Sequence, residues 1–540
     1  MKEGFRQSMS WLHTWLGLVV GWILFLVYLT GTLGYLDKEI DYWMTPDRPF
    51  FAEPGTQQQQ LTLAQDRLQL IAPDAARWNI QLIGGREAPS LDIAWTEKAP
   101  APGALAATHR ETLDPVTGQP IDYSARTTGG GQVLYKMHYY LAYIPQDTAI
   151  LFIMACTLIM FTAMISGIIV HKGIFREFFT FRPGKGRRSW LDGHTLLSVP
   201  ALPFHLIVTY SGFLFFVAQT MPAAPTLLYG ENPRDTVIPK MYEGVYPYPL
   251  PELPEAAGNV APLASLAGMI PQVDALWSKG MATSVEVHNP GDGNARAMFK
   301  PQETQSIAFP ETAIVFDAVS GELVENYPGP DVYPAGKADQ VLKGLHKGLF
   351  AGWFLRLLYL FMGVGGTAMV GTGLLLWANK RRNRLLAKNE PLHFGIWLVD
   401  RLNLGTVIGM PAAVAAYFWS NRLLPATLTT RAEWEVHTMY LTMAALFLYP
   451  VVRSIDKARV EMLGLCASAY LLLPVVNALT TTRHLGVSLP DGDWIMAGFD
   501  LTSLACGVIA AALALKARNL RASDAVTRRR ARVGELAVSD

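Results

Sequence analysis

Eight long apolar segments constrain this chain more than any other feature of its sequence. A helix that spans a bilayer needs about 20 apolar residues, and each segment is close to that length. Only 16% of the 540 residues are charged, whereas an average soluble domain has about 25%. We therefore expect a polytopic α-helical membrane protein with about eight transmembrane helices, at residues 11–35, 149–171, 194–220, 350–377, 396–424, 435–452, 460–481 and 494–516.

The connecting segments differ in charge, and this difference predicts an orientation. Basic residues gather in alternate connections, namely 172–193, 378–395, 453–459 and the tail 517–540. The positive-inside rule places these connections, and therefore both termini, in the cytoplasm. The first apolar segment is too long for a signal-peptide core, so we expect it to remain as an anchor. The net charge of +1 gives no support to nucleic-acid binding.

Two hydrophilic inserts, residues 36–148 and 221–348, fall on the opposite, outer side of the membrane. Each is large enough for a small folded domain and contains short strand-like runs. The first contains Asp114-Pro-Val-Thr-Gly118, and the second contains the similar Asp317-Ala-Val-Ser-Gly321. Asp and Gly at these positions favour tight turns. We expect two small α+β lobes, produced by an internal duplication.

The membrane segments also repeat. His13 is followed eighteen residues later by Gly31, and His194 has the same spacing to Gly212. Met137-His138 introduces the second segment, and Leu345-His346 introduces the fourth. These two segments end with Ser166-Gly and Thr372-Gly. The unit of helix, outer lobe and helix therefore occurs twice, whereas residues 396–516 lack the pattern and are expected to form an appended four-helix bundle.

Paired histidines at both membrane faces predict bound haem. His13 and His194 are equivalent at the cytoplasmic edge, and His138 and His346 are equivalent on the outer side. Neutral imidazole is a common axial ligand of haem iron in electron-transfer proteins, and facing helices of a bundle can supply both ligands. No Cys-x-x-Cys-His sequence is present, so we expect about two non-covalently held haem b groups, with these four histidines as axial ligands of the iron.

Two further histidines are candidates for cofactor binding. His171 occupies the place of Trp377 in the second repeat, and His205 occupies the place of Leu24 in the first. They can be haem ligands, propionate partners or quinol contacts. The other five histidines are assigned to surface or packing positions. Gly129-Gly-Gly131 does not form a nucleotide-binding fingerprint, so we expect the electron donor to be a separate partner.

These residues resemble the PepSY-associated transmembrane helix family. The similarity rests on Trp11-Leu-His-Thr-Trp-Leu-Gly17, Met137-His138, Leu191-Asp-Gly-His194 and Leu345-His346, and it covers about residues 1–385. The segment that opens at Leu61 looks like a PepSY lobe. The resemblance implies a bacterial inner-membrane reductase, because characterised relatives bind two haems and reduce ferric siderophores on the periplasmic side, releasing Fe(II). The four additional spans depart from the family pattern.

We therefore expect a membrane-bound ferric-siderophore reductase that receives electrons from a cytoplasmic or quinol donor. One alternative is a quinone-linked membrane cytochrome. Others are a transporter component that uses the appended bundle, and a regulator that binds periplasmic proteins without redox activity.

Overall fold

The computed structural model describes residues 3–84, 86, 88–101, 105–123, 125–171, 173–174, 180–182, 184, 187–221, 223, 226–227, 253–301, 306–308, 312–327 and 334–538. Parts of the basic loop 172–193 and of the second insert lie outside these residues. The chain divides into two compact units. A helical unit contains Met1–Pro46, Arg126–Phe216 and Trp353–Asp540, and a second unit contains Asp47–Ala125 and Val217–Gly352.

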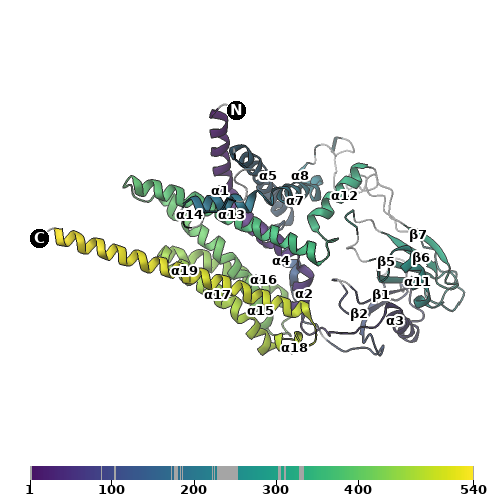
Figure 1. Cartoon of the computed structure of the whole chain (residues 1–540). Coiled ribbons are helices and arrows are strands. Elements are labelled where there is room, and N and C mark those ends of the chain that lie inside the picture. The colour runs from purple at the N-terminus through teal and green to yellow at the C-terminus, as the bar shows by residue number, and fades with distance from the viewer. Residues whose placement is uncertain are drawn as a thin grey trace. The chain divides into compact units, whose positions relative to one another are not determined.

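The helical unit contains the membrane spans. Seven helices of the described residues are long and apolar enough to cross a membrane, and up to eight spans result if a bent pair is one crossing. The chain is thus a multi-pass membrane protein by helix length and composition. The main helices (Figure 1) are α1 (Glu3–Gly34), α5 (Gln146–Val170), α13 (Trp353–Ala387), α16 (Arg431–Val452), α17 (Ile455–Thr480) and α19 (Trp494–Val538). Helices α14 (Phe394–Leu404) and α15 (Met410–Leu423) form one further span, joined by a π-helical turn at Gly405–Gly409.

The bent pair corrects the prediction of one helix over 194–220. The structure instead has α6 (Arg187–Ser198) and α7 (Leu202–Phe215), bent by 62° at the break. Pro200 lies in this break. It has no N–H for a helical hydrogen bond and disfavours a helical conformation at the residue before it. Pro203 lies in the first turn of α7, where a missing N–H costs nothing.

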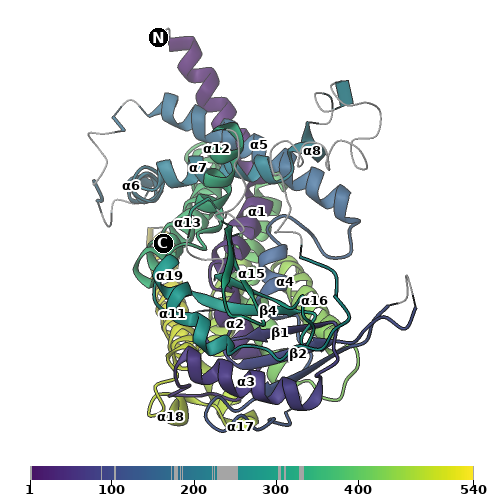
Figure 2. The same ribbon diagram turned by 90° about the vertical axis from the view of Figure 1, so that its right-hand side faces the viewer.

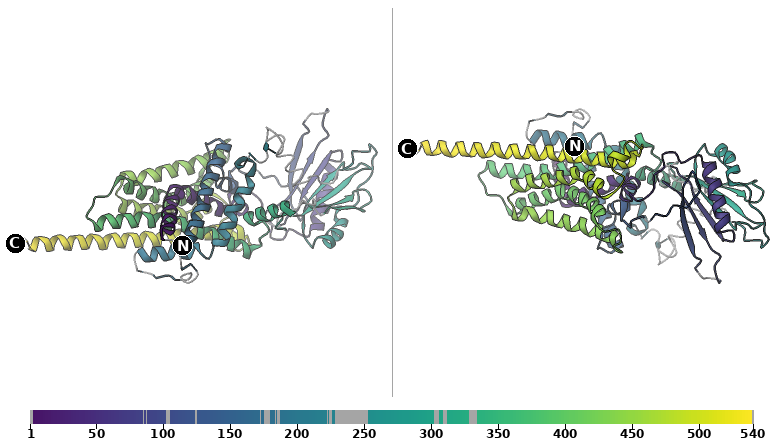
Figure 3. Two further views of the ribbon diagram at one scale, coloured as in Figure 1. Left: turned by 90° about the horizontal axis from the view of Figure 1, so that it is seen from above. Right: turned by 90° about the horizontal axis from the view of Figure 1, so that it is seen from below.

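The described residues of the helical unit also include the short helices α2 (Asp37–Met44), α4 (Gly130–Lys136) and α18 (Leu485–Ser488). Helix α1 packs against α5, α13 and α4, while α6 packs against α13. In the appended bundle, here α14 to α19, α17 lies beside the first part of α19, whose C-terminal part extends beyond it (Figure 1, Figure 3).

Within the residues that the structure describes, the two inserts form one sheet and not two separate lobes. The antiparallel order is β3-β2-β1-β4-β5-β6-β7, and the inserts meet where β1 pairs with β4. The first insert supplies α3 (Gln57–Ile71), β1 (Arg77–Gln81), β2 (Leu91–Thr96) and β3 (Thr108–Leu113). Helix α8 (Val217–Thr220) precedes the second insert, which supplies α11 (Leu266–Leu276), β4 (Ala282–His288), β5 (Arg296–Pro301), β6 (Ala313–Asp317), β7 (Leu323–Tyr327) and α12 (Pro334–Lys347).

The shared core explains why the inserts combine. Leu61 and Leu68 of α3 and Ile270 of α11 lie in one buried apolar cluster with inward residues of the strands, such as Trp78 and Phe299. Helices α3 and α11 contact each other and lie in front of the strands in Figure 2. A three-stranded insert alone would leave this apolar face open to water, so the two halves stabilise each other.

The two predicted turns are confirmed and are built alike. The Asp114 carboxylate accepts hydrogen bonds from the backbone N–H groups of Val116 and Thr117, and Gly118 has a φ of 72°. Asp317 accepts the corresponding bonds after β6, and Gly321 has a φ of 78°. Glycine suits both final positions because it adopts positive φ without steric cost.

Candidate functional site

His13 and His194 face each other between two helix pairs. His13 lies on α1 where this helix packs against α5, and His194 lies on α6 where it packs against α13. Their ring centroids are 6.5 Å apart, with an interplanar angle of 66°. Both side chains are half-buried. The predicted inner pair is therefore brought together in space.

Each ring is oriented by a backbone carbonyl of the neighbouring helix. The Nδ1 atom of His13 lies 2.8 Å from the Ala163 carbonyl oxygen, and the Nδ1 atom of His194 lies 3.0 Å from that of Met369. A carbonyl only accepts, so Nδ1 is the donor in both rings. In the neutral imidazole this leaves the Nε2 lone pair available to a metal, as in sites where a histidine ligand is oriented through its other nitrogen.

The carbonyl partners occupy equivalent positions in the two repeats. Ser166 donates a hydrogen bond to the Ala163 carbonyl at 2.9 Å, and Thr372 donates to the Met369 carbonyl at the same distance. The Ser-Gly and Thr-Gly sequences that marked the repeat therefore surround the two histidines in the same way. The two carbonyl partners themselves carry no recognisable sequence signal.

Glycine is needed beside both rings. A Cβ atom built on Gly167 would lie 3.1 Å from Cε1 of His13, and one built on Gly373 would lie 3.3 Å from Cε1 of His194. Both distances are shorter than ordinary van der Waals contact. The glycines therefore allow each imidazole to lie against the backbone of the helix that accepts its hydrogen bond.

The 6.5 Å between the two ring centroids can be compared with the spacing of two imidazoles that bind one metal ion. A metal–imidazole nitrogen bond is about 2 Å long, so two imidazoles on one iron have centroids separated by roughly 6 Å. Two side chains supply only two donors, which is the number that haem iron takes from protein in a six-coordinate site. The donor set therefore fits haem.

Aromatic and basic side chains lie close to this pair along the chain. The Arg381 guanidinium lies 3.7 Å from the Trp377 ring centroid and 5.0 Å from that of Trp15. The two indole rings are 5.8 Å apart. His171 ends α5 as its C-cap and is half-buried. No described contact assigns it to the His13 and His194 pair.

His205 is the most deeply buried of the candidate histidines. Its exposed fraction is 1%, and its Nδ1 lies 3.3 Å from the hydroxyl of Tyr28. Within the described residues, its Nε2 has no hydrogen-bond partner. A Cβ on Gly366 would lie 2.8 Å from Cε1 of His205, so this ring also depends on a glycine. Because Gly366 precedes Gly373 by seven residues, His205 and His194 contact α13 about 10 Å apart along its axis.

His138 lies just beyond α4, and its side chain faces Gly31 of α1, where an added Cβ would lie 3.6 Å from that of His138. Its Nδ1 contacts the Tyr135 carbonyl. Loss of solvation lowers the pKa of His138 below its ordinary value, and the Tyr135 bond raises it by less. The predicted partner His346 lies in the last turn of α12, which belongs to the other compact unit.

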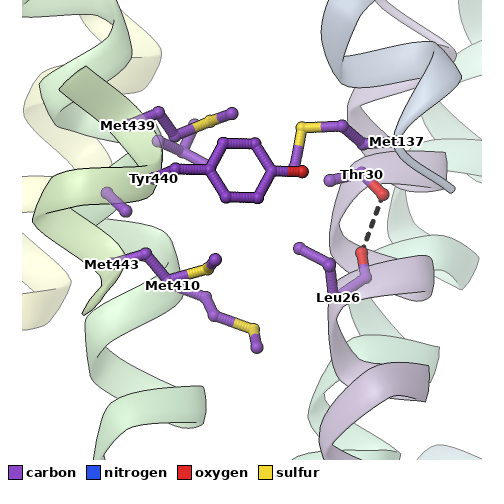
Figure 4. A pocket seen from close by; sticks show the side chains of 9 residues that line it. Leu26, Thr30, Met137, Met410, Met439, Tyr440 and Met443 are labelled. Carbon is purple, nitrogen blue, oxygen red and sulfur yellow. Dashed lines mark hydrogen bonds between the residues drawn. The ribbon is translucent and has the colours of Figure 1, made fainter. Parts of the chain in front are cut away.

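A methionine-lined pocket that includes Met137 was not foreseen from the sequence (Figure 4). Tyr440 of α16 points toward Met137, the residue before His138, and the opposite wall includes Leu26 and Thr30 of α1. The remaining lining residues are Met410, Ala413, Val414, Met439 and Met443. The only residue of this pocket that the sequence analysis had named is Met137, as part of the Met137-His138 pair.

Four of the other histidines have packing or surface partners. His288 lies 3.4 Å from the Glu286 carboxylate. His109 stacks on Trp95 with ring centroids 5.2 Å apart. His437 stacks on Tyr143, and the side chain of His484 accepts a hydrogen bond at the start of α18. These contacts agree with the structural roles expected for them.

Comparison with known proteins gives a family. A search of curated proteins found no match. The model of the family described as "PepSY-associated TM region" matches residues 10–380. This range includes all six candidate histidines and ends before the appended bundle. The chain belongs to the PepSY-associated TM region family.

Proposed function

We propose that this protein is a haem b oxidoreductase of the bacterial inner membrane that passes electrons to ferric siderophores on the periplasmic side. The observation that carries the proposal is the His13 and His194 pair, with centroids 6.5 Å apart. Both rings use Nδ1 for a backbone carbonyl and so keep Nε2 for a metal.

The inner haem is assigned to His13 and His194. Their carbonyl bonds fix the tautomer and the ring orientation, so both rings are held ready before the cofactor binds. Haem bound there supplies a one-electron iron couple. His171 is a competing ligand for this position because it lies at the cytoplasmic end of α5.

The outer haem is assigned to His138 and His346 from their equivalent places in the repeats. Loss of solvation lowers the pKa of His138, which favours the neutral imidazole, the form that binds iron. His205 is the competing donor, since its buried Nε2 has no described partner. One haem near each face divides a hydrocarbon core of about 30 Å into shorter electron-transfer steps.

The direction of electron transfer is inferred from the basic connecting segments and from a sequence without a nucleotide-binding motif. The basic connections place both termini in the cytoplasm, so the sheet unit faces the periplasm. The donor is a separate cytoplasmic protein or a quinol. Siderophores hold Fe(III) with hard oxygen donors, and addition of one electron weakens this binding, so that Fe(II) is released.

A reduced-minus-oxidised visible spectrum of the detergent-purified protein tests the proposal. The α and Soret bands of haem b should appear, with about two haems per chain. His13→Ala and His194→Ala should each remove one of them. A featureless spectrum would leave the regulator or transporter alternatives in place.

A further inference from the structure

The segment that leads to His138 is held by the appended bundle, which lies beyond the region shared with the family. This segment, residues 126–143, contains Gly129-Gly130-Gly131, the helix α4 and then Met137-His138. It belongs to the same compact unit as the appended helices, so its contacts with them can be followed residue by residue.

Glu435 of α16 makes the central contact. Its carboxylate accepts a 2.7 Å bond from the Thr128 hydroxyl and a 2.9 Å bond from the Gly129 N–H. Arg431 forms an ion pair with it at 2.6 Å, and both of these side chains have no exposed surface. Asn421 donates to the same carboxylate at 2.8 Å. Four donors thus satisfy a buried charge that would otherwise be costly.

Neighbouring groups bind the same short stretch of backbone. The Arg431 guanidinium donates to the Thr127 carbonyl at 2.7 Å, and the Tyr417 hydroxyl donates to the Gly130 carbonyl at 2.8 Å. On the other side, the Gly131 N–H donates to the carboxylate of Asp41 in α2 at 2.7 Å. The segment is therefore enclosed between the appended bundle and α2.

The three glycines are required by this enclosure. A Cβ on Gly129 would lie 2.6 Å from the Tyr417 hydroxyl, and one on Gly131 would overlap the backbone of Asp37. Gly130 has a φ of 61°, which favours glycine. The Gly-Gly-Gly sequence, which has no nucleotide-binding role, is thus explained by backbone packing.

Helix α16 also contacts residues on both sides of His138 in the sequence. Met137 lines the pocket with Met439, Tyr440 and Met443 of α16 (Figure 4). The Tyr440 hydroxyl accepts a 3.3 Å bond from the Ala142 N–H. Contacts from α16 therefore occur immediately before and shortly after His138.

We propose that the appended bundle positions His138 by holding residues 126–143, with Glu435 and Tyr417 as positioning residues. The inference rests on the proposed role of His138 as an outer haem ligand. The four additional spans then have a function, because they fix the position of His138. The position of this ligand in turn determines the spectrum and the midpoint potential of the outer haem.

Thr128→Val and Tyr417→Phe test the inference with little change in side-chain volume, and Glu435→Gln removes the charge. Glu461→Gln is the matched control, because Glu461 is a carboxylate of the same bundle bound to Arg453 and Tyr449. Arg453 follows the opposite end of α16 from Arg431, about 33 Å away at helical rise. Amide hydrogen exchange of residues 126–143 is measured in haem-free protein, and electron paramagnetic resonance and midpoint potentials are measured in haem-loaded protein.

Tyr417→Phe loses one buried hydrogen bond and should raise exchange in this segment about tenfold. Thr128→Val loses the bonds of its hydroxyl with Glu435, Gly130 and Asn421 and should raise exchange at least as much. The outer haem signal and potential should shift, while the inner haem and the control remain unchanged. Unchanged exchange in both variants would overturn the inference, as would faster exchange with an unaltered outer haem. Absence of haem from the wild-type protein would refute the proposed function, and this result is distinguishable from the two outcomes that overturn the inference.

Discussion

His13 and His194 face each other at 6.5 Å between ring centroids, and each is bound through Nδ1 to the carbonyl three residues before an equivalent Ser or Thr. This relationship joins the two repeats at one point in the membrane. It leaves the Nε2 atoms as the chemically available groups, and it explains why glycine follows the Ser or Thr in each repeat.

Gly167→Val should disrupt the inner site, because a Cβ at this position already lies 3.1 Å from the His13 ring. Overpacking of this kind costs about 1–3 kcal/mol, which weakens retention of the inner haem roughly 5- to 150-fold. Haem content after gel filtration measures the loss. Gly17→Val is the control, since no atom lies within 4 Å of a Cβ there. Equal haem content in both variants would contradict the packing argument.

His138→Ala and His346→Ala should each remove the same haem signal, since we propose both as ligands of the outer haem from their equivalent places in the repeats. Low-temperature visible spectra and haem content distinguish the two haems. If either variant keeps full haem content and normal reduction, the pair is wrong. Loss of that signal in His205→Ala, with retention in His346→Ala, would assign the ligand role to His205.

His194→Ala should block electron uptake from the cytoplasmic side and leave the outer haem bound and reducible by dithionite. The reason is that His194 is proposed as a ligand of the inner haem alone. Stopped-flow reduction from each side of oriented vesicles measures this effect. Retention of two haems in both His13→Ala and His194→Ala proteins would transfer the inner role to His171 and His205.

The sheet unit should lose stability in acid through Glu286. A hydrogen bond from His288 and the nearby Lys300 lower the pKa of Glu286 to about 2. A lowered carboxyl pKa stabilises the folded state above the unfolded value of about 4.3, and this contribution is lost as the pH falls from there toward 2. It is on the order of 1–3 kcal/mol. Hydrogen exchange of β4 and β5 between pH 5 and pH 2.5 should show the loss, and Glu286→Gln should flatten the pH profile. An unchanged profile in that variant would contradict the assignment.

Much of the site could be predicted from spacing within the repeats. The equivalence of His13 and His194 can be read from the eighteen-residue spacing of each to a glycine. The Ser166-Gly and Thr372-Gly sequences can be read in the same way. The sequence does not contain the information that places Ala163 against His13, because helix packing partners depend on tertiary contacts. For the same reason, the spatial relation of His171 and His205 to the pairs was left open.

The incorrect fold predictions have local physical causes. Pro200 interrupts an apolar segment whose hydropathy alone predicts one helix. The strand pattern of each insert is compatible with a separate lobe, but the pairing of Asn79 with Glu286 in β1 and β4 joins the two inserts in one sheet. The buried charges of Arg431 and Glu435 were missed because a charged pair near the end of an apolar segment is usually at the membrane surface.

The central claim is that electrons leave this protein for a ferric siderophore on its periplasmic face. The most direct test uses sided vesicles containing pre-reduced protein, a ferric siderophore added to one face, and a ferrous chelator to trap Fe(II). We predict reoxidation of the haem spectrum with stoichiometric Fe(II) capture only when the chelate is on the periplasmic face. A reduced spectrum that ferric chelates leave unchanged while a quinone reoxidises it rapidly would contradict the account and identify a quinone-linked cytochrome.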